Sequence, residues 1–205
     1  MRASVLVVGL VGLMACGSGE KPAAVAVDTS RPWAKPGDTI DSILPMPEMV
    51  RRFRVGLVEP TELTGGAASR DALAERFIGA IATRDTSALR AMLLSRAEFA
   101  WLMFPDHRYA EPPYELDPAI FWLQLTAENS KGVERVLQRY GGQKLAFEQL
   151  TCGADTLQMR RGPTTLWGPC SVRYRTADST LTRRLFGSMI ERNGRVKLVS
   201  YNNDF

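Results

Sequence analysis

The order of hydrophobic periods along the chain restricts the possible folds more than any other feature. Between Ser69 and Tyr140 the apolar residues recur at helical spacing, whereas after Gly142 they alternate as in strands. A parallel sheet would require helices and strands to alternate along the chain. The sequence therefore predicts an α+β fold, with N-terminal helices followed by an antiparallel sheet of about four strands.

Capping and turn residues mark the ends of these elements. Ser69 and Asp85 are suited to cap two successive helices, and Ser95 with Glu98 forms a capping box that opens a third helical segment reaching Phe104. A long helix is expected from Asp117-Pro118 to about Tyr140, where two glycines end it. Strands are expected at residues 144–152, 165–176, 180–192 and 195–201, with a type I′ turn at Asn193-Gly194.

The strand expected at residues 180–192 is apolar on both faces. Leu185 and Met189 lie on one face, and Phe186 and Ile190 on the other. Such a strand indicates a sheet that is covered on both sides. The helices supply one cover, and the second is either the segment at residues 43–57 or another subunit.

The first sixteen residues have the pattern of a secretory signal, with Arg2 before a short apolar run that ends in Leu-Met-Ala-Cys. This ending resembles the lipobox of bacterial lipoproteins. The resemblance implies that residues 1–15 are a signal peptide and that Cys16 becomes a lipidated N-terminus. It also implies a bacterial cell envelope protein, anchored to a membrane, with its domain on the periplasmic or extracellular side. An ordinary signal peptide with an incidental cysteine is the alternative.

The region between the signal and the domain divides into two parts. Residues 16–38 are small, polar and proline-bearing and predict a lipidated flexible linker. Residues 39–68 predict a docking segment and a connector, because the apolar residues from Pro47 to Leu57 have helical spacing. We expect this helix to pack on the outer face of the sheet, where it would cover Phe186 and Ile190. A partner-binding helix is the alternative.

Charge and cysteine content exclude several classes of function. The net charge of +4 is too small to indicate nucleic-acid binding. With Cys16 assigned to lipid, Cys152 and Cys170 predict a structural disulfide in an oxidising compartment. A metal site is disfavoured because His107 is the single histidine and no Cys-x-x-Cys motif occurs. No cofactor is expected.

The segment from Leu73 to Leu93 (LAERFIGAIATRDTSALRAML) resembles the opening helices of the nuclear-transport-factor-like, cystatin-like cone superfamily. The resemblance extends over residues 69–205 and implies a curved sheet in a cone-like roll. One departure is that residues 96–104 look helical where such domains usually enter a strand. The superfamily includes isomerases, dehydratases, cyclases and binding modules. The chain also resembles an uncharacterised lipoprotein family through residues 186–192 and 201–204.

Candidate site residues are few. His107 with Asp106 and Tyr109 could act as a base, its orienting acid and a further polar group, although a single loop histidine is more often a surface residue. The cone resemblance implies interior acids and tyrosines, adding Asp117, while Glu128 and Asn129 are expected to face solvent. An apolar ligand pocket near the cone mouth is predicted, with core packing as the alternative. Its expected residues are Trp101, Phe104, Tyr114, Phe121, Trp122 and Tyr174.

Motifs of serine hydrolases, zinc proteases and nucleotide-binding proteins are absent from the sequence. We therefore expect a membrane-tethered, non-enzymatic binding or interaction module. A small-molecule enzyme of the isomerase or dehydratase type that uses the cone interior is the alternative. Expected partners are membrane lipid through Cys16 and a protein partner or second copy, but no nucleic acid.

Overall fold

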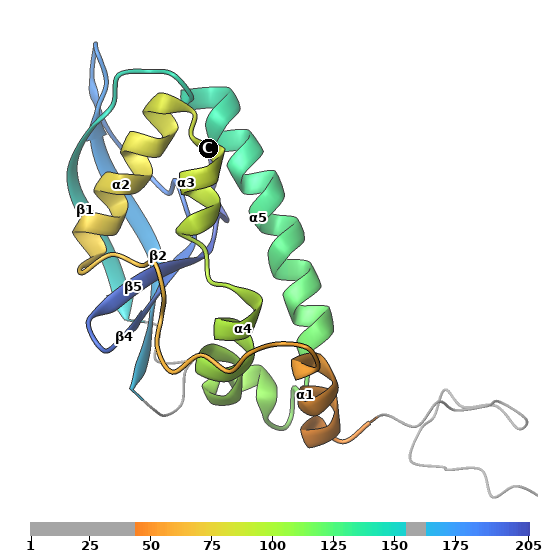
Figure 1. The fold of residues 1–205 in the computed structure, drawn as a ribbon. Coiled ribbons are helices and arrows are strands. Elements are labelled where there is room, and N and C mark those ends of the chain that lie inside the picture. Colours follow the sequence, from red (N-terminus) through yellow and green to blue (C-terminus); the bar gives the residue numbers. More distant parts are fainter. Residues whose placement is uncertain (1–43, 155–162) are drawn as a thin grey trace, which may run out of the picture. The chain divides into compact units, whose positions relative to one another are not determined.

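The computed structural model describes residues 44–154 and 163–205, which belong to one compact unit, Leu44–Phe205 (Figure 1). The expected signal peptide, Cys16 and the linker lie outside the described residues. None of the helices in the described ranges has the length and apolar composition needed to cross a bilayer.

The helices begin and end close to the predicted residues. They are α1 (Met46–Arg54), α2 (Arg70–Thr83), α3 (Thr86–Ala91), α4 (Arg96–Glu98) and α5 (Pro118–Tyr140). The α4 helix continues as a π turn, η1 (Phe99–Met103), and as two 3-10 turns, η2 (Phe104–Asp106) and η3 (Arg108–Ala110). Ser69, Asp85 and Asp117 accept backbone N–H groups as caps, and the Ser95–Glu98 capping box is present. The helical prediction for residues 96–104 is thereby confirmed.

The sheet is curved and antiparallel and has five strands, one more than expected. They are β1 (Ala146–Ala154), β2 (Thr164–Arg175), β3 (Thr180–Arg183), β4 (Ser188–Arg192) and β5 (Arg195–Ser200), in the order β1-β2-β4-β5 with β3 also on β2. The expected strand at residues 180–192 is interrupted between Arg183 and Ser188, so one part pairs with each end of β2. Asn193 and Gly194 have φ values of 49° and 71°, as a type I′ turn requires.

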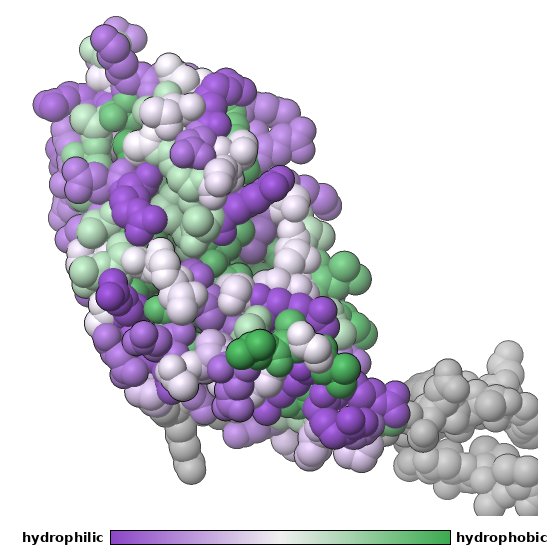
Figure 2. Space-filling view, in the orientation of Figure 1, coloured by the Kyte–Doolittle hydropathy of each residue, from purple (hydrophilic) through white to green (hydrophobic). Residues whose placement is uncertain are grey.

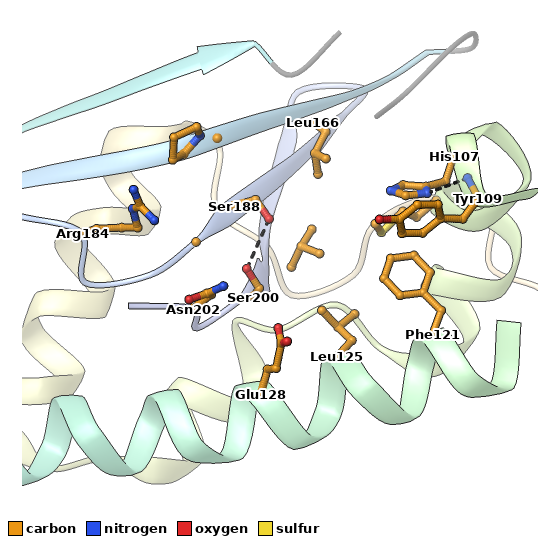
Figure 3. Close-up of a pocket in the computed structure, with 15 residues that line it drawn as sticks. His107, Tyr109, Phe121, Leu125, Glu128, Leu166, Arg184, Ser188, Ser200 and Asn202 are labelled. Carbon is orange, nitrogen blue, oxygen red and sulfur yellow. Dashed lines mark hydrogen bonds between the residues drawn. The ribbon is translucent and has the colours of Figure 1, made fainter. Parts of the chain in front are cut away.

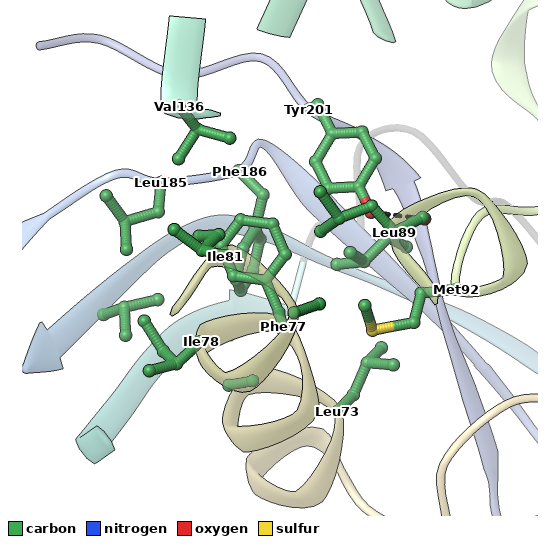
Figure 4. Packing of buried hydrophobic residues seen from close by; sticks show 14 of the residues in the cluster. Leu73, Phe77, Ile78, Ile81, Leu89, Met92, Val136, Leu185, Phe186 and Tyr201 are labelled. Carbon is green, nitrogen blue, oxygen red and sulfur yellow. Dashed lines mark hydrogen bonds between the residues drawn. The ribbon is translucent and has the colours of Figure 1, made fainter. Parts of the chain in front are cut away.

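Two apolar clusters lie on opposite faces of β4 and β5. Met189 and Leu198 point into the main core beneath α2, α3 and α5, where Phe77 and Phe186 pack edge to face (Figure 4). Their neighbours Ile190 and Val199 point the other way, into a second cluster with Phe99, Phe104 and Leu125. The sheet is therefore covered on both faces, as predicted. The placement of Phe186 beside Ile190 is wrong, because the break between Arg183 and Ser188 turns Phe186 into the main core with Leu185.

The position expected for α1 is wrong. The second cover of the sheet is formed by η1, η2 and α5, and α1 packs against η1 and α5. Phe53 of α1 meets Phe99 with ring centroids 5.6 Å apart. The connector after α1 belongs to the same unit, because Leu63 is buried and Ala67 pairs with Val196. Residues 44–68 are therefore part of the domain.

Cys152 and Cys170 form the predicted disulfide. They are opposite each other on β1 and β2, which explains why the bond fits the ladder. Closing an 18-residue separation stabilises a fold by about 3 kcal/mol in the chain-entropy model.

Polar contacts from the C-terminal tail fix α5 against β5. Asn129 donates to the Val199 carbonyl (3.2 Å) and accepts from the Tyr201 N–H (2.7 Å), while Asn203 donates to the Gly132 carbonyl (2.8 Å). The expectation that Asn129 faces solvent is therefore wrong, because the side chain is buried under the tail.

Candidate functional site

A pocket of about 400 Å³ lies between α5 and the strands β2, β4 and β5 (Figure 3). In the close-up, Phe121, Leu125 and Glu128 rise from α5 toward Leu166, Ser188 and Ser200 of the strands. These α5 residues lie within an eight-residue stretch, so the pocket follows the helix for about 10 Å. Its volume is within the range of small-molecule sites.

One end of the pocket is polar. Arg184, Ser188, Ser200, Asn202 and Glu128 line it, and the Ser188 and Ser200 hydroxyls are 3.4 Å apart. The Arg184 guanidinium also forms an ion pair of 3.3 Å with Asp204, and both side chains remain partly exposed. This end therefore offers a cation, a carboxylate, an amide and two hydroxyls to a ligand.

The other end is apolar and aromatic. Met103, Leu125, Leu166 and Val199 line it together with Tyr109 and Phe121. The His107 ring lies 4.8 Å from the Tyr109 ring and 5.0 Å from the Phe121 ring, centroid to centroid. The pocket therefore changes from apolar to polar along its length, from Phe121 to Glu128 and Arg184.

His107 is not the surface residue that the sequence suggested. Its side chain is 2% exposed, and its Nδ1 atom accepts the N–H of Tyr109 at 3.2 Å. The short η2 and η3 turns bring the ring inward, a placement that a proline-rich loop sequence does not reveal. The ring forms part of the pocket wall.

A break in the sheet opens the polar end. Gly187 lies between β3 and β4, and a Cβ atom on it would come within 2.2 Å of the Ser200 hydroxyl. A side chain here would require Ser200 and Asn202 to shift, so the glycine allows a close approach where the chain turns out of one strand and re-enters beside β5. Arg184 and Ser188 are placed on the pocket rim by this turn.

The predicted site residues are only partly brought together. His107, Tyr109 and Phe121 line the pocket. Asp106 does not; burial raises the pKa of its carboxyl, and the positive charge of Arg192 opposes this shift. Asp117 caps α5.

The remaining aromatic candidates have other surroundings. Tyr174 packs on Tyr140 in the main core, and Phe104 is buried in the second cluster. Trp101 lies beneath Arg54, and Tyr114 beneath Arg108. Trp122 contacts Phe99 and lines a second hollow of about 350 Å³ between α5 and the residues that follow α3.

The polar pocket residues were missed by sequence analysis. Arg184, Ser188, Ser200 and Asn202 come from the sheet break, β4, β5 and the tail, and no motif joins them. The clustered Asn residues after Tyr201 were a visible signal, but their partners could be found only from the fold.

A buried ion pair lies outside this pocket. Lys197 Nζ of β5 and the Glu98 carboxylate are 2.8 Å apart, with both side chains at most 4% exposed. Glu98 also accepts the N–H groups of Ser95 and Thr64, each at 2.7 Å. Burial alone would raise the pKa of Glu98, but the hydrogen bonds from Lys197, Ser95 and Thr64 outweigh it and hold the pKa below its usual value.

Within the described ranges, no three His, Cys, Asp or Glu side chains are grouped as a metal ion would require. Comparisons of this chain with protein-family models, with curated proteins and with solved structures gave no match.

Proposed function

We propose that this chain is a bacterial envelope lipoprotein, tethered through Cys16, whose domain binds a small amphipathic ligand without transforming it. The observation that carries the proposal is the pocket of about 400 Å³ with an aromatic end and a polar end. Such a pocket suits a ligand with an apolar body and a hydrogen-bonding head group. The lipobox ending in Cys16 supports the location at a membrane.

The polar end favours a head group that carries negative charge. Arg184 is the cation among the lining residues, and Asn202 and the two serines add hydrogen-bond donors. Glu128 also lines this end and would repel an anion, so the head group is expected nearest to Arg184. The proposed ligand is therefore oriented with its head near Arg184 and its body against Phe121.

Binding can be tested with a dansyl-labelled undecanoate as the probe. The chain from Gly17 to Phe205, which retains the whole compact unit, would be exported with a foreign signal peptide so that the disulfide forms. We expect saturable enhancement of dansyl emission. Leu125→Trp should abolish it by filling the pocket, and Arg184→Gln should weaken it about tenfold through loss of a charged contact.

Matched controls come from adjacent positions. Arg183 neighbours Arg184 but is absent from the pocket lining, and Leu123 is exposed on the outer side of α5. Arg183→Gln and Leu123→Trp should leave probe binding unchanged, with melting curves confirming that all variants are folded. Equal binding by Leu125→Trp and the unchanged chain would refute the pocket as the site.

Lipidation is tested separately in a bacterial host. The full chain should incorporate a labelled fatty acid, whereas Cys16→Ser should remain an unlabelled precursor. Labelling that persists in Cys16→Ser would contradict the anchor.

A second candidate function is catalysis of the isomerase or dehydratase type. It is favoured by one observation, that His107, Tyr109 and Glu128 line the same pocket. An isomerase that moves a proton would incorporate deuterium from heavy water into small carbonyl compounds, and His107→Gln would stop this. We prefer binding because the Nδ1 atom of His107 is engaged by the Tyr109 N–H and its ring is packed between two aromatic rings.

The fold also supports the assignment of a cone-like domain. Paired helices followed by a curved antiparallel sheet agree with the resemblance to nuclear-transport-factor-like cone domains. The sequence predicts the cone mouth between the third helical segment and the long helix, and Met103 and Phe121 of these two segments line the pocket.

A further inference from the structure

We propose that the end of the domain formed by α1 and the start of α5 docks on the membrane surface. The docking surface consists of Val55, Val58, Ile120 and Leu123. This inference goes beyond ligand binding, and it rests on the proposed tether only in that Cys16 brings the domain to a bilayer.

The first observation is the distribution of exposed apolar side chains. Among the described residues, the large apolar side chains that are exposed are Val55, Val58, Tyr114, Ile120 and Leu123. Val55 and Val58 lie just after α1, Tyr114 lies in the loop before α5, and Ile120 and Leu123 lie in the first two turns of α5. Val58 is 86% exposed and Leu123 67%. The green atoms near α1 and along the outer edge of α5 in Figure 2 show apolar surface at this end.

The second observation is that these residues are held close together. Phe53 of α1 and Trp122 of α5 both contact Phe99, with ring centroids 5.6 Å and 5.2 Å away. The α1 and α5 helices also contact each other directly. The exposed residues after α1 and in the first turns of α5 therefore belong to adjacent elements, while Phe53 and Trp122 pack inward on the same aromatic ring.

The third observation concerns the flanking side chains. Arg54 lies 4.8 Å above the Trp101 ring, and Arg108 lies 4.3 Å above the Tyr114 ring. Tryptophan, tyrosine and arginine next to exposed aliphatic residues are typical of surfaces that sit at the head-group level of a bilayer.

Charge does not supply the main attraction. Arg51 and Arg52 are both engaged by Glu48, and Glu59, Glu111 and Glu115 also belong to this end. The positive and negative charges nearly balance. Docking should therefore depend on insertion of the aliphatic side chains and should vary little with salt.

The path of the chain favours a membrane as the occupant. The described chain begins at Leu44, directly before α1. Residues 17–43 can extend at most about 90 Å from an anchored Cys16, so the domain stays within that distance of the bilayer and weak docking suffices. The tether enters the domain at α1, beside the proposed docking surface. A second copy is less favoured, because a patch of a few hundred Å² is smaller than the roughly 800 Å² per partner of a stable dimer.

The test uses the unlipidated chain 17–205 and vesicles of phosphatidylethanolamine and phosphatidylglycerol at three to one. We expect co-sedimentation with the vesicles at millimolar lipid, similar at low and high salt. Val58→Asp combined with Leu123→Asp should reduce the partition coefficient at least about tenfold, because two charged groups would enter the interface. The control pair, Ala177→Asp with Thr180→Asp, adds the same charge at exposed sites near β3 and should bind as the unchanged chain does.

Three outcomes would overturn the proposal. Failure of the unchanged chain to sediment would do so even if Cys16 proves to be lipidated. Equal losses in both variant pairs would show a general charge effect. A dimer in solution that Val58→Asp with Leu123→Asp dissociates would assign the surface to a second copy. Absence of lipid label at Cys16 would instead remove the tether and leave the vesicle result intact.

Discussion

At Gly132 the backbone of the C-terminal tail passes too close to α5 for any side chain. A Cβ atom there would lie 1.9 Å from the Tyr201 carbonyl oxygen. Because the helix backbone fixes the position of the Cβ and the Tyr201 oxygen belongs to the tail backbone, the clash can be relieved only by moving the tail or the helix. The hydrogen bonds of Asn129 and Asn203 would then be disturbed as well.

We expect Gly132→Ala to lower the free energy of unfolding by about 3 kcal/mol. Gly79 in α2 is the matched control, because nothing lies within 4 Å of its added Cβ. Gly79→Ala should raise stability by about 0.5–1 kcal/mol through helix propensity. Chemical denaturation of the three chains measures both effects, and equal stabilities for the two variants would contradict the close approach.

Glu98 and Lys197 give a second prediction at the scale of residues. The folded pKa of Glu98 lies below its ordinary value, so its contribution is complete at neutral pH and is lost as the pH falls through the folded pKa. Glu98→Gln leaves the Lys197 ammonium buried without a carboxylate and should cost about 3 kcal/mol at pH 7.

The difference between Glu98→Gln and the unchanged chain should then shrink in acid, below the ordinary pKa of about 4.3. Glu148→Gln removes a partly exposed ion pair with Arg173 and should cost less than about 0.5 kcal/mol. Unfolding midpoints in denaturant, measured from pH 3 to pH 7, test this. A constant difference across that range would show that the ionised carboxylate is not what stabilises the pair.

Single polar residues were the hardest features to predict from the sequence. Asn129 and His107 were expected at the surface and are both buried. Periodicity identifies the apolar stripe of a helix, but a polar residue at the edge of the stripe is buried only if another segment crosses it. For Asn129 that segment is the tail after β5, whose path depends on the whole fold. His107 is instead turned inward by the η2 and η3 turns, onto Tyr109 and Phe121.

At the scale of elements, the sequence predicts boundaries well where capping chemistry is local. Ser69, Asp85, Ser95 and Asp117 each cap the helix expected of them, because a cap depends on residues within one turn. The break between β3 and β4 was missed because Gly187 was read as part of a continuous strand. Its close contact with Ser200, thirteen residues further along the chain, is set by the whole fold and leaves no local signal in the sequence.

The α1 helix was predicted correctly as an element and incorrectly in its contacts. The apolar stripe of α1 must be buried. Neither the stripe nor the position of the helix in the sequence specifies which element of the fold covers it. Phe53 is 5% exposed, packs on Phe99 and lies beneath Arg96, whose guanidinium is 4.5 Å from the ring centroid. The partner is thus η1 and not the sheet.

Phe53→Ala should lower the free energy of unfolding by about 3 kcal/mol, because it leaves a cavity against Phe99. Val55→Ala, two residues away and 68% exposed, should change it by less than about 0.5 kcal/mol. Thermal denaturation of both variants makes the comparison. Similar small effects at the two positions would mean that α1 is not docked in solution.

At the scale of the whole molecule, the aromatic cluster around Phe99 joins the two proposed sites. Phe99 contacts Phe53 beneath the docking surface and also Phe121, which lines the apolar end of the pocket. The polar end, with Arg184, lies further along α5. A domain docked through α1 and the start of α5 would therefore hold the apolar end of its pocket nearer to the bilayer.

This arrangement predicts that the domain takes an amphipathic ligand directly from a membrane. Dansyl-labelled undecanoate loaded into vesicles should transfer to the chain at a rate that rises with vesicle concentration, because contact with the bilayer precedes uptake. Val58→Asp with Leu123→Asp should slow this transfer about tenfold and leave the equilibrium affinity for free probe unchanged, since neither residue lines the pocket. Stopped-flow fluorescence measures the rate and titration the affinity. A transfer rate that is independent of vesicle concentration would mean that the ligand leaves the membrane first, and docking would then have no part in loading the pocket.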